Sequence, residues 1–273
     1  MTLNCNGKIL DFKIPKVMGI LNLTPDSFYD GGKYNKVESA LKQTESMIEA
    51  GANFIDLGAY STKPGAKPVS VEAEKKRLLP VLERLTKIHP KTHFSIDTFR
   101  STVAADALDR GAAMINDISG GQFDNKMMNT VGYYNVPYVL MHTSGKPETM
   151  QKNPKYKDVV KEVIYYFSNQ IQSAYKAGIN DVIIDPGFGF GKTISHNYEI
   201  LKNLKFFQNF ELPVMIGLSR KSMIYNKLGI SPDEALNGST ILNTVALIKG
   251  ANILRVHDVK QAKECVDLLQ ALR

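Results

Sequence analysis

The sequence predicts an α/β fold: a (β/α)8 TIM barrel that forms a single domain over residues 1–273, preceded by a short N-terminal β-hairpin. Eight short apolar runs are continuous rather than alternating, as in strands buried on both faces of a parallel sheet. Helical periodicities separate these runs, and that order is typical of an α/β protein. The length of 273 residues agrees with such a barrel, which commonly has about 250.

The hairpin is expected in LNCNGKILDF, residues 3–12, where Asn-Gly forms a turn between two short apolar arms. We expect it to close the floor of the barrel. The first barrel strand follows Pro15 in PKVMGILN, because proline cannot continue a helix. The next helix has one periodic face, formed by Val37, Leu41, Thr44 and Ile48.

Four junctions repeat the order helix end, glycine, strand. A glycine at this place can adopt the left-handed conformation that ends a helix, and an apolar run follows each one. Each junction therefore predicts an αβ loop and the strand after it. The four are Gly51 in EAGANFIDLG, Gly111 in DRGAAMINDIS, Gly178 in KAGINDVIIDP and Gly250 in IKGANILRVH.

Three further strands complete the eight. HFSIDT occupies residues 93–98, while Pro137 and Pro213 introduce PYVLMH and PVMIGLS. A doubly wound open sheet is the competing fold, and it is less favoured because no glycine-rich phosphate loop follows the first strand. A second helical face is formed by Val160, Val163, Ile164, Phe167 and Ile171.

Composition narrows the class of protein. The net charge is +7, but lysine and arginine are not clustered with aromatic residues, so we expect small anionic substrates rather than nucleic acid. No apolar run approaches the roughly 18 residues that span a bilayer, and the N-terminus does not resemble a signal peptide. We therefore expect a cytoplasmic protein without membrane contact. Cys5 and Cys265 have no C-x-x-C or histidine partner nearby, which predicts buried free thiols.

The stretch DPGFGFGKT, residues 185–193, ends like a phosphate-binding P-loop but does not match one. The first glycine of that motif would fall at Pro186, which has no amide proton to offer a phosphate. Its glycines also alternate as G-x-G-x-G, unlike the dinucleotide motif. We interpret the stretch as a strand end that presents Asp185, followed by a glycine turn.

Polar residues gather at the predicted strand ends, where TIM barrels place their chemistry. A buried carboxylate there can accept hydrogen bonds from the N–H edge of a flat heterocycle, and Asn116 can bind the neighbouring ring nitrogens. This favours a pterin or guanine-like ring, while Arg255 and His257 suit a phosphate or diphosphate. The strand-end set is Asn22, Asp56, Asp97, Asn116, Asp185, Ser219, Arg220, Lys221, Arg255 and His257.

Two loops add groups to this rim. NLTPDSFYDGG follows the first strand, and its Phe28 could close over a ligand. YSTKPGA follows the second strand and offers the hydroxyl of Thr62, the charge of Lys63 and a rigid turn at Pro64. In isolation each could equally be an ordinary mobile loop.

Seven motifs in order resemble the dihydropteroate synthase family: GILNLTPDSFYDGG, STKPGA, SIDT, IND, DPGFGFGKT, GLSRKSMI and RVHDV, from about residue 17 to residue 258. The resemblance implies a transferase of folate biosynthesis that is a target of sulfonamides. Such an enzyme joins 4-aminobenzoate to (7,8-dihydropterin-6-yl)methyl diphosphate and releases diphosphate by an SN1-like route. It also implies Mg²⁺ as cofactor and a homodimer.

The resemblance further implies roles for individual residues. The catalytic set is Asp30, Asp97, Asp185 and Lys221. The pterin set is Asp97, Asn116, Met141, Asp185, Lys221 and Arg255. The diphosphate set is Asn22, Lys63, Arg255 and His257, with Asn22 also the protein ligand of Mg²⁺. The aminobenzoate set is Phe28, Thr62, Pro64, Phe190 and Ser219.

One motif departs from the family pattern. GAYSTKPGA stands where the family usually has GGESTRPGA, so Lys63 keeps the charge but lacks the planar fork of arginine. Ala59 and Tyr60 replace glycine and glutamate. Two other functions stay open: a methyl-transferring barrel that binds a methylated folate for a corrinoid partner, and a pterin-binding module without catalysis.

Overall fold

The computed structural model describes residues 1–24, 32–61, 68–147 and 149–272. Eight parallel strands form the barrel in the order β8-β7-β6-β5-β4-β3-β10-β9. The bridge between Ile184 and Val214 closes the ring, which confirms the predicted TIM barrel. The strands are β3 (Lys16–Asn22), β4 (Phe54–Gly58), β5 (His93–Asp97), β6 (Met114–Asp117), β7 (Tyr138–Met141), β8 (Val182–Asp185), β9 (Met215–Ile216) and β10 (Ile253–Val256).

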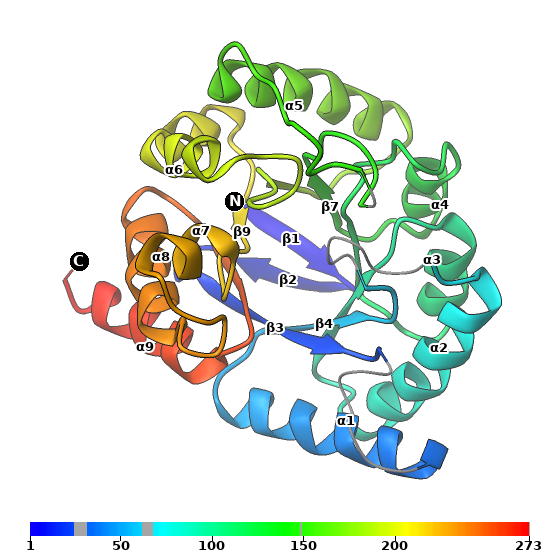
Figure 1. The fold of residues 1–273 in the computed structure, drawn as a ribbon. Helices are drawn as coiled ribbons and strands as arrows, with labels where there is room; N and C mark the ends of the chain where they lie inside the picture. The colour runs from blue at the N-terminus through cyan, green and yellow to red at the C-terminus, as the bar shows by residue number, and fades with distance from the viewer. Residues whose placement is uncertain (25–31, 62–67, 148, 273) are drawn as a thin grey trace.

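Helices surround the ring on the outside (Figure 1). A short additional helix, α7, lies between β9 and the helix α8 that precedes the last strand. The helical elements are α1 (Gly32–Glu49), α2 (Val71–Ile88), α3 (Ser101–Leu108), α4 (Met127–Tyr134), α5 (Val159–Lys176), α6 (Ile194–Lys202), the 3-10 helix η2 (Leu204–Phe210), α7 (Ser222–Leu228), α8 (Leu236–Ile248) and α9 (Val259–Gln270).

The four glycine junctions are confirmed. Gly51, Gly111, Gly178 and Gly250 have φ angles of 95°, 89°, 86° and 98°. These angles lie in the left-handed region, which glycine adopts without the steric cost that a Cβ atom brings. Each one ends a helical segment and precedes a barrel strand, namely β4, β6, β8 and β10.

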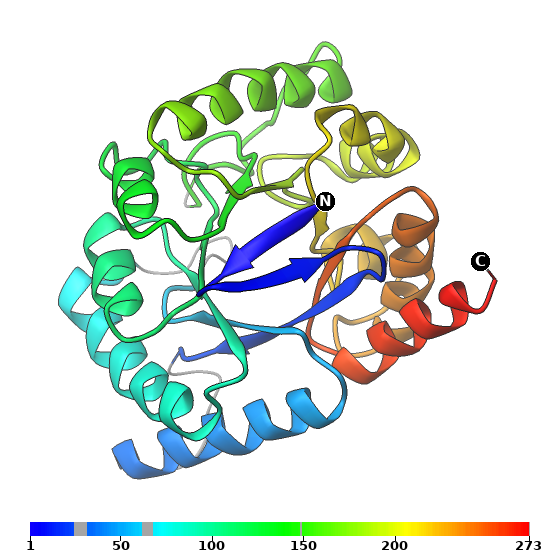
Figure 2. The same ribbon diagram turned by 180° about the vertical axis from the view of Figure 1, so that it is seen from behind.

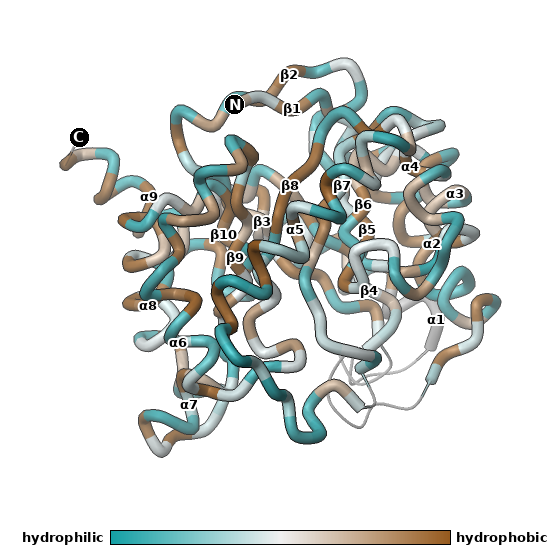
Figure 3. The backbone as a smooth tube through the Cα atoms, turned by 90° about the horizontal axis from the view of Figure 1, so that it is seen from above, coloured by the Kyte–Doolittle hydropathy of each residue, from teal (hydrophilic) through white to brown (hydrophobic). Residues whose placement is uncertain are grey.

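The N-terminal hairpin is also confirmed. Strand β1 (Thr2–Cys5) pairs antiparallel with β2 (Lys8–Asp11), and Asn6 and Gly7 have φ angles of 52° and 78°, as a two-residue hairpin turn requires. The hairpin lies across the ring (Figures 1 and 2). Figure 3 shows it at one end of the barrel and α7 at the other.

The hairpin closes the barrel floor by packing against the inward side chains at the start of the strands. Leu3, Cys5 and Phe12 form one buried cluster with those residues. The thiols of Cys5 and Cys265 are buried and free, as predicted. The strand residues of the cluster are Met18, Phe54, Met114, Val139, Ile183, Met215 and Ile253, and Ala113 directly precedes β6.

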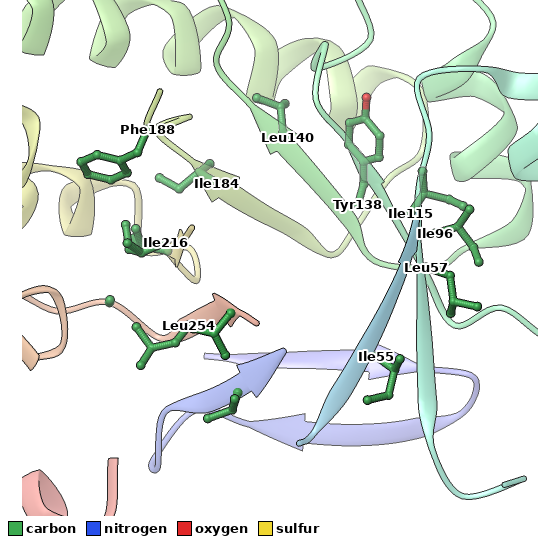
Figure 4. Packing of buried hydrophobic residues seen from close by; sticks show 14 of the residues in the cluster. Ile55, Leu57, Ile96, Ile115, Tyr138, Leu140, Ile184, Phe188, Ile216 and Leu254 are labelled. Atoms are coloured by element: carbon green, nitrogen blue, oxygen red, sulfur yellow. The ribbon is translucent and has the colours of Figure 1, made fainter. Parts of the chain in front are cut away.

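A second and larger cluster fills the space between the strands and the helices. Side chains alternate along a strand, so the neighbours of the inward residues point to the helices. Ile55, Leu140 and Leu254 belong to this outer layer, part of which Figure 4 shows. No helix in the described part of the chain is long and apolar enough to cross a membrane.

Strand β9 is shorter than the apolar run PVMIGLS suggests. Only Met215 and Ile216 pair with β10. A turn begins at once, because the N–H of Lys221 donates to the carbonyl of Leu218 at 3.2 Å. Arg220 within this turn has a φ of 54°, an uncommon angle for a residue other than glycine. The sequence run therefore contains both the strand and the turn that follows it.

Candidate active site

Inward side chains rise from the floor of the barrel toward the carboxyl ends of the strands. Because side chains alternate, every second residue above a floor residue also points inward. In β4 these are Phe54, Asp56 and Gly58. The same parity brings the polar strand-end residues to one mouth: Asn22 on β3, Asp97 on β5, Asn116 on β6, Met141 on β7, Asp185 on β8 and Arg255 on β10.

Arg255 on β10 bonds to residues of β4 and β5 at the centre of this mouth, and a residue of β6 joins them through Asp56. Arg255 Nε donates to Asp56 Oδ2 and its Nη2 to Asp97 Oδ2, each at 2.7 Å. Asn116 Nδ2 donates to the same oxygen of Asp56 at 2.9 Å. Asp56 is completely buried, so its charge depends on these two donors. The guanidinium group is thus fixed as a flat surface over the buried carboxylates.

Burial controls the charge of this cluster. It raises the pKa of Asp97 to about 7, against the pull of the Arg255 cation and with the repulsion of Asp56. Burial alone lowers the pKa of Arg255, but Asp56 and Asp97 outweigh it and raise that pKa. Asn116 Oδ1 and Asp97 Oδ1 have no hydrogen bond to any residue that the structure describes, so both can accept from a ligand.

Asp185 ends β8 beside this cluster. Its Oδ1 accepts a hydrogen bond from the N–H of Gly187 at 2.7 Å, and no described residue bonds its Oδ2. Burial raises the pKa of Asp185, while Lys221, Arg255 and Lys192 oppose the rise. Met141 lies opposite Asp185 on β7. This arrangement agrees with a pterin site in which Asp185 accepts N–H donors and Met141 packs nearby.

The segment after Asp185 is a glycine turn and not a nucleotide loop. Gly187, Gly189 and Gly191 have φ angles of 69°, 80° and 60°. A Cβ atom on Gly187 would stand 2.0 Å from the carbonyl oxygen of His142, so only glycine fits there. Thr193 ends the turn by capping helix α6 through the N–H of His196.

Lys221 links the predicted pterin and aminobenzoate residues. Its Nζ donates to the carbonyl oxygen of Phe188 and lies 4.7 Å from the ring centroid of Phe190. Burial lowers the pKa of Lys221 to about 8, although the carboxylate of Asp185 opposes this effect. The ammonium group therefore stands between Asp185 and the aromatic ring.

Ser219 and His257 form a hydrogen-bonded pair. The distance from Ser219 Oγ to His257 Nδ1 is 3.0 Å, and the N–H of His257 donates to Ser219 Oγ at 3.2 Å. His257 follows the end of β10 by one residue instead of lying on the strand with Arg255. Arg220 makes two hydrogen bonds to Asp258, at 2.7 and 3.0 Å, so the loops after β9 and β10 are held together.

Asn22 is the candidate ligand for Mg²⁺. It is exposed at the end of β3, and Gly58 separates it from Asp97: a Cβ atom on Gly58 would stand 3.8 Å from Asn22 Oδ1 and 3.6 Å from Asp97 Oδ2. Within the described ranges no three His, Cys, Asp or Glu side chains cluster to hold a metal. A single side-chain oxygen from Asn22 fits Mg²⁺, because this ion often binds one or two protein oxygens and completes its coordination shell with substrate phosphates and water.

Five predicted residues lie outside the described residues: Phe28, Asp30, Thr62, Lys63 and Pro64. Their roles stay predictions from the resemblance.

Tyr60, one of the departures from the family pattern, lies within the described residues. Its buried ring stands 5.1 Å from that of Phe99 and 5.2 Å from the guanidinium carbon of Arg100. Arg100 also bonds Glu74 and the carbonyl of Val69, both at 2.6 Å. Tyr60 therefore offers its aromatic face to an arginine that a buried carboxylate already neutralises.

Two residues have larger roles than the sequence suggested. Asp56 was recognised as a polar strand residue without a role, and it proves to hold both Asn116 and Arg255. A carboxylate in the apolar run FIDLG, at the inward parity, was the available signal. Lys192, in the Gly-Lys-Thr that resembles the end of a P-loop, is buried, and four acceptors surround the three donors of its ammonium group.

Comparisons with known proteins identify the family to which this chain is similar. The profile of a family described as pterin binding enzyme matches residues 18–257. The chain is 44% identical to the dihydropteroate synthase of Escherichia coli K12 over 273 residues, covering 99% of this chain and 96% of that protein. It is also similar to two solved structures. One is Yersinia pestis dihydropteroate synthase with a sulfonamide drug complex (TM-score 0.94, 40% identity, 100% and 99% coverage). The other is Xanthomonas albilineans dihydropteroate synthase with 4-aminobenzoic acid (TM-score 0.93, 40% identity, 99% and 97% coverage).

Proposed function

The chain belongs to the dihydropteroate synthases, within the family of pterin-binding enzymes, and on that premise we propose how its own residues divide the reaction among them. The enzyme is a transferase of folate biosynthesis. It joins (7,8-dihydropterin-6-yl)methyl diphosphate to 4-aminobenzoate, forms 7,8-dihydropteroate and releases diphosphate. Neither a methyl-transferring barrel nor a module without catalysis is supported by these relatives.

The pterin ring binds among the buried groups of the mouth. Asp185 Oδ2, Asp97 Oδ1 and Asn116 Oδ1 are acceptors without a described partner, as is the buried Asp56 Oδ1, and a pterin presents N–H donors along one edge. Arg255, held flat by Asp56 and Asp97, packs against a face of the ring. The convergence of these side chains on one mouth is the observation that carries the assignment.

The diphosphate tail lies toward His257 and Asn22. Ser219 Oγ accepts the N–H of His257, so its own proton is free to bond His257 Nδ1. The ring proton of a neutral His257 then sits on Nε2 and can be donated to a phosphate oxygen. Asn22 is the residue that would hold Mg²⁺, which when bound supplies positive charge that makes diphosphate a better leaving group.

We expect bond cleavage to precede attack, as in an SN1-like route. The C–O bond to diphosphate breaks, the electron pair leaves with the diphosphate, and the dihydropterin delocalises the positive charge of its methylene carbon. Asp97 and Asp185, when ionised, stabilise this cation. The aryl amine of 4-aminobenzoate then attacks the methylene carbon from the side of Phe190, and a C–N bond forms. The amine loses its proton to water after this bond has formed, so it needs no strong base.

Diphosphate release in the presence of both substrates tests this assignment directly. We expect release that depends on Mg²⁺ and on the aryl amine. A sulfonamide should compete with 4-aminobenzoate, since it presents the same aryl amine to the same ring pocket. Release that is absent with both substrates and Mg²⁺ present would overturn the assignment of roles.

A homodimer is proposed as the state in solution. Three large apolar side chains are exposed on neighbouring helices: Leu228 at the end of α7, with Ile241 and Ile248 on α8. A helix that is apolar on most of its faces is usually covered. The cytoplasmic location and the absence of nucleic-acid or membrane partners stay predictions, which cell fractionation and binding assays would test.

A further inference from the structure

Lys192 is a buried lysine, and among the described residues no carboxylate lies within hydrogen-bonding range of its Nζ. Burial lowers the pKa of Lys192 to about 7, although Asp185 opposes this effect. Only 3% of its surface is exposed. Its Nζ lies 2.9 Å from His142 Nδ1, 2.9 Å from the carbonyl oxygen of Gly187, 3.0 Å from that of Phe190 and 3.3 Å from that of His142. Burial of an ammonium group without an ion-pair partner is costly. A side chain that served only to fill this space would be better replaced by an apolar one of the same size.

Two of the three carbonyl partners of Lys192, those of Gly187 and Phe190, belong to the turn that connects Asp185 to helix α6. The N–H of Gly187 donates to Asp185 Oδ1, and the N–H of Phe190 donates to the carbonyl of Gly187. Three glycines at positive φ leave this turn many alternative conformations. The ammonium group binds the carbonyls of Gly187 and Phe190 together, and it thereby selects one conformation of the turn.

His142 completes the arrangement from the neighbouring strand. Its backbone N–H donates to the carbonyl of Asp185 at 3.0 Å, and its Nδ1 must be unprotonated to accept from Lys192. Burial, followed by the charge of Lys192, lowers the pKa of His142 to about 2, so the ring stays neutral. Lys192 therefore ties the end of β7 to the turn after β8.

We propose that Lys192 is a positioning residue of the active site: with His142 as its fixed acceptor, it sets the turn that aims Asp185 at the pterin and Phe190 at the aminobenzoate. The inference rests on the proposed roles of Asp185 and Phe190. In their protonated forms Lys192 and Lys221 both oppose the rise in the pKa of Asp185, while burial lowers the pKa of Lys192 to about 7 and that of Lys221 to about 8. Lys192 opposes that rise without touching substrate.

Lys192→Met tests the proposal, because methionine keeps the length of the apolar stem and removes the donors. We expect the Kd of a pterin analogue, measured by calorimetry on the folded protein, to rise at least tenfold, and the KM for 4-aminobenzoate to rise with it. Lys155→Met is the matched control, since Lys155 is exposed in a loop nearby. A lowered unfolding temperature with unchanged Kd and KM would show a structural role only.

Chemical rescue separates donation from packing. Lys192→Ala leaves a cavity that a small alkylammonium ion or an alcohol of the same size can enter. We expect propylammonium to restore pterin binding at least severalfold more than propanol does, because only the ammonium can donate to several carbonyls at once. Equal rescue by both compounds would overturn the proposal.

A pair of variants at His142 covers the case in which Lys192 variants do not fold. His142→Asn places an amide oxygen where Nδ1 stands, and His142→Leu removes the acceptor. We expect the asparagine variant to bind the pterin analogue within about threefold of the natural protein and the leucine variant to bind it at least tenfold more weakly. Equal affinities would contradict the proposal. The natural protein in the two-substrate assay tests the proposed function independently.

Discussion

Each charged residue of the mouth is held in place by others. Arg255 bridges two carboxylates, and Asp56 in turn receives the amide of Asn116. Buried charges of this kind contribute little net stability, since desolvation offsets their attraction. Their value is geometric, because a ring bound between them meets donors and acceptors that need not move during the reaction.

Asp185→Asn should weaken binding of a pterin analogue by about 1.5–3 kcal/mol, because the variant replaces charge-assisted hydrogen bonds with neutral ones. Calorimetry on the natural and variant proteins would measure the difference. Asp11→Asn is the control, since Asp11 is exposed on the hairpin at the opposite end of the barrel. An unchanged pterin affinity in the Asp185 variant would contradict the assigned contact.

Pterin binding should depend on pH through three residues. Burial raises the pKa of Asp97 to about 7, and it lowers that of Lys192 to about 7 and that of Lys221 to about 8. Because the site needs ionised Asp97 with protonated Lys192 and Lys221, affinity should rise from pH 6, peak near 7 and fall at higher pH. Titration calorimetry across this range would show the peak. In the Asp97→Asn variant the loss of affinity below pH 7 should disappear. If affinity still falls at low pH in this variant, Asp97 is not the residue responsible.

The raised pKa of Asp97 affects folding stability in the opposite direction from pterin binding. A raised pKa means that folded Asp97 binds its proton more tightly than the unfolded chain does. Its contribution to stability is therefore present at low pH and is lost as the pH rises from about 4, the usual value for aspartate, toward 7. The site gains the ionised carboxylate at the expense of stability.

At the scale of elements, the turn after β8 shows how closely two loops approach. Gly187→Ala should destabilise the protein by about 1–3 kcal/mol more than Gly178→Ala does. Both glycines have positive φ, but a Cβ atom meets the carbonyl of His142 at 2.0 Å in the first case and nothing within 4 Å in the second. Urea unfolding of the two variants would measure the difference. An equal loss of unfolding free energy in the two variants would mean that the turn can shift to accommodate the Cβ atom, which would contradict the prediction.

The order of strands and helices could be predicted because local signals mark it. Glycine caps, prolines and continuous apolar runs each identify one boundary without reference to the rest of the chain. Strand β9 was predicted too long, since an apolar pattern does not show where pairing stops and the Arg220 turn begins. Alternation also predicts which strand residues point inward, as Phe54 and Asp56 illustrate.

Contacts across the barrel could not be predicted in the same way. Asp56 and Arg255 are 199 residues apart, and no local pattern states that they meet. Lys192 was missed for a related reason: its partners are mainly backbone carbonyls, which every residue has. The roles of Phe28, Asp30, Thr62, Lys63 and Pro64 still rest on the resemblance alone.

At the scale of the whole molecule, the proposed dimer can be tested through the exposed face of α8. Ile241→Glu places a charge among the apolar side chains of α7 and α8, where desolvation in an interface would be costly. Light scattering at several concentrations should give about twice 30.4 kDa for the natural protein and about 30.4 kDa for the variant. Tyr165→Glu on α5, where Tyr165 is 71% exposed, should leave the mass unchanged. A natural protein that is monomeric at all concentrations would refute the proposal.

The hairpin covers the floor of the barrel, so in the part of the chain that the structure describes the site is approached from the carboxyl ends of the strands. Asp185 and Asn116 lie deep in this site, whereas Phe190 and His257 stand nearer its entrance. Because both substrates enter from the same end, the dihydropterin diphosphate must bind first. A molecule of 4-aminobenzoate that binds before it blocks its path. The product must likewise leave through this end before the next substrate molecule binds. Steady-state kinetics should accordingly show a compulsory order, with 4-aminobenzoate inhibiting the reaction when it is in large excess.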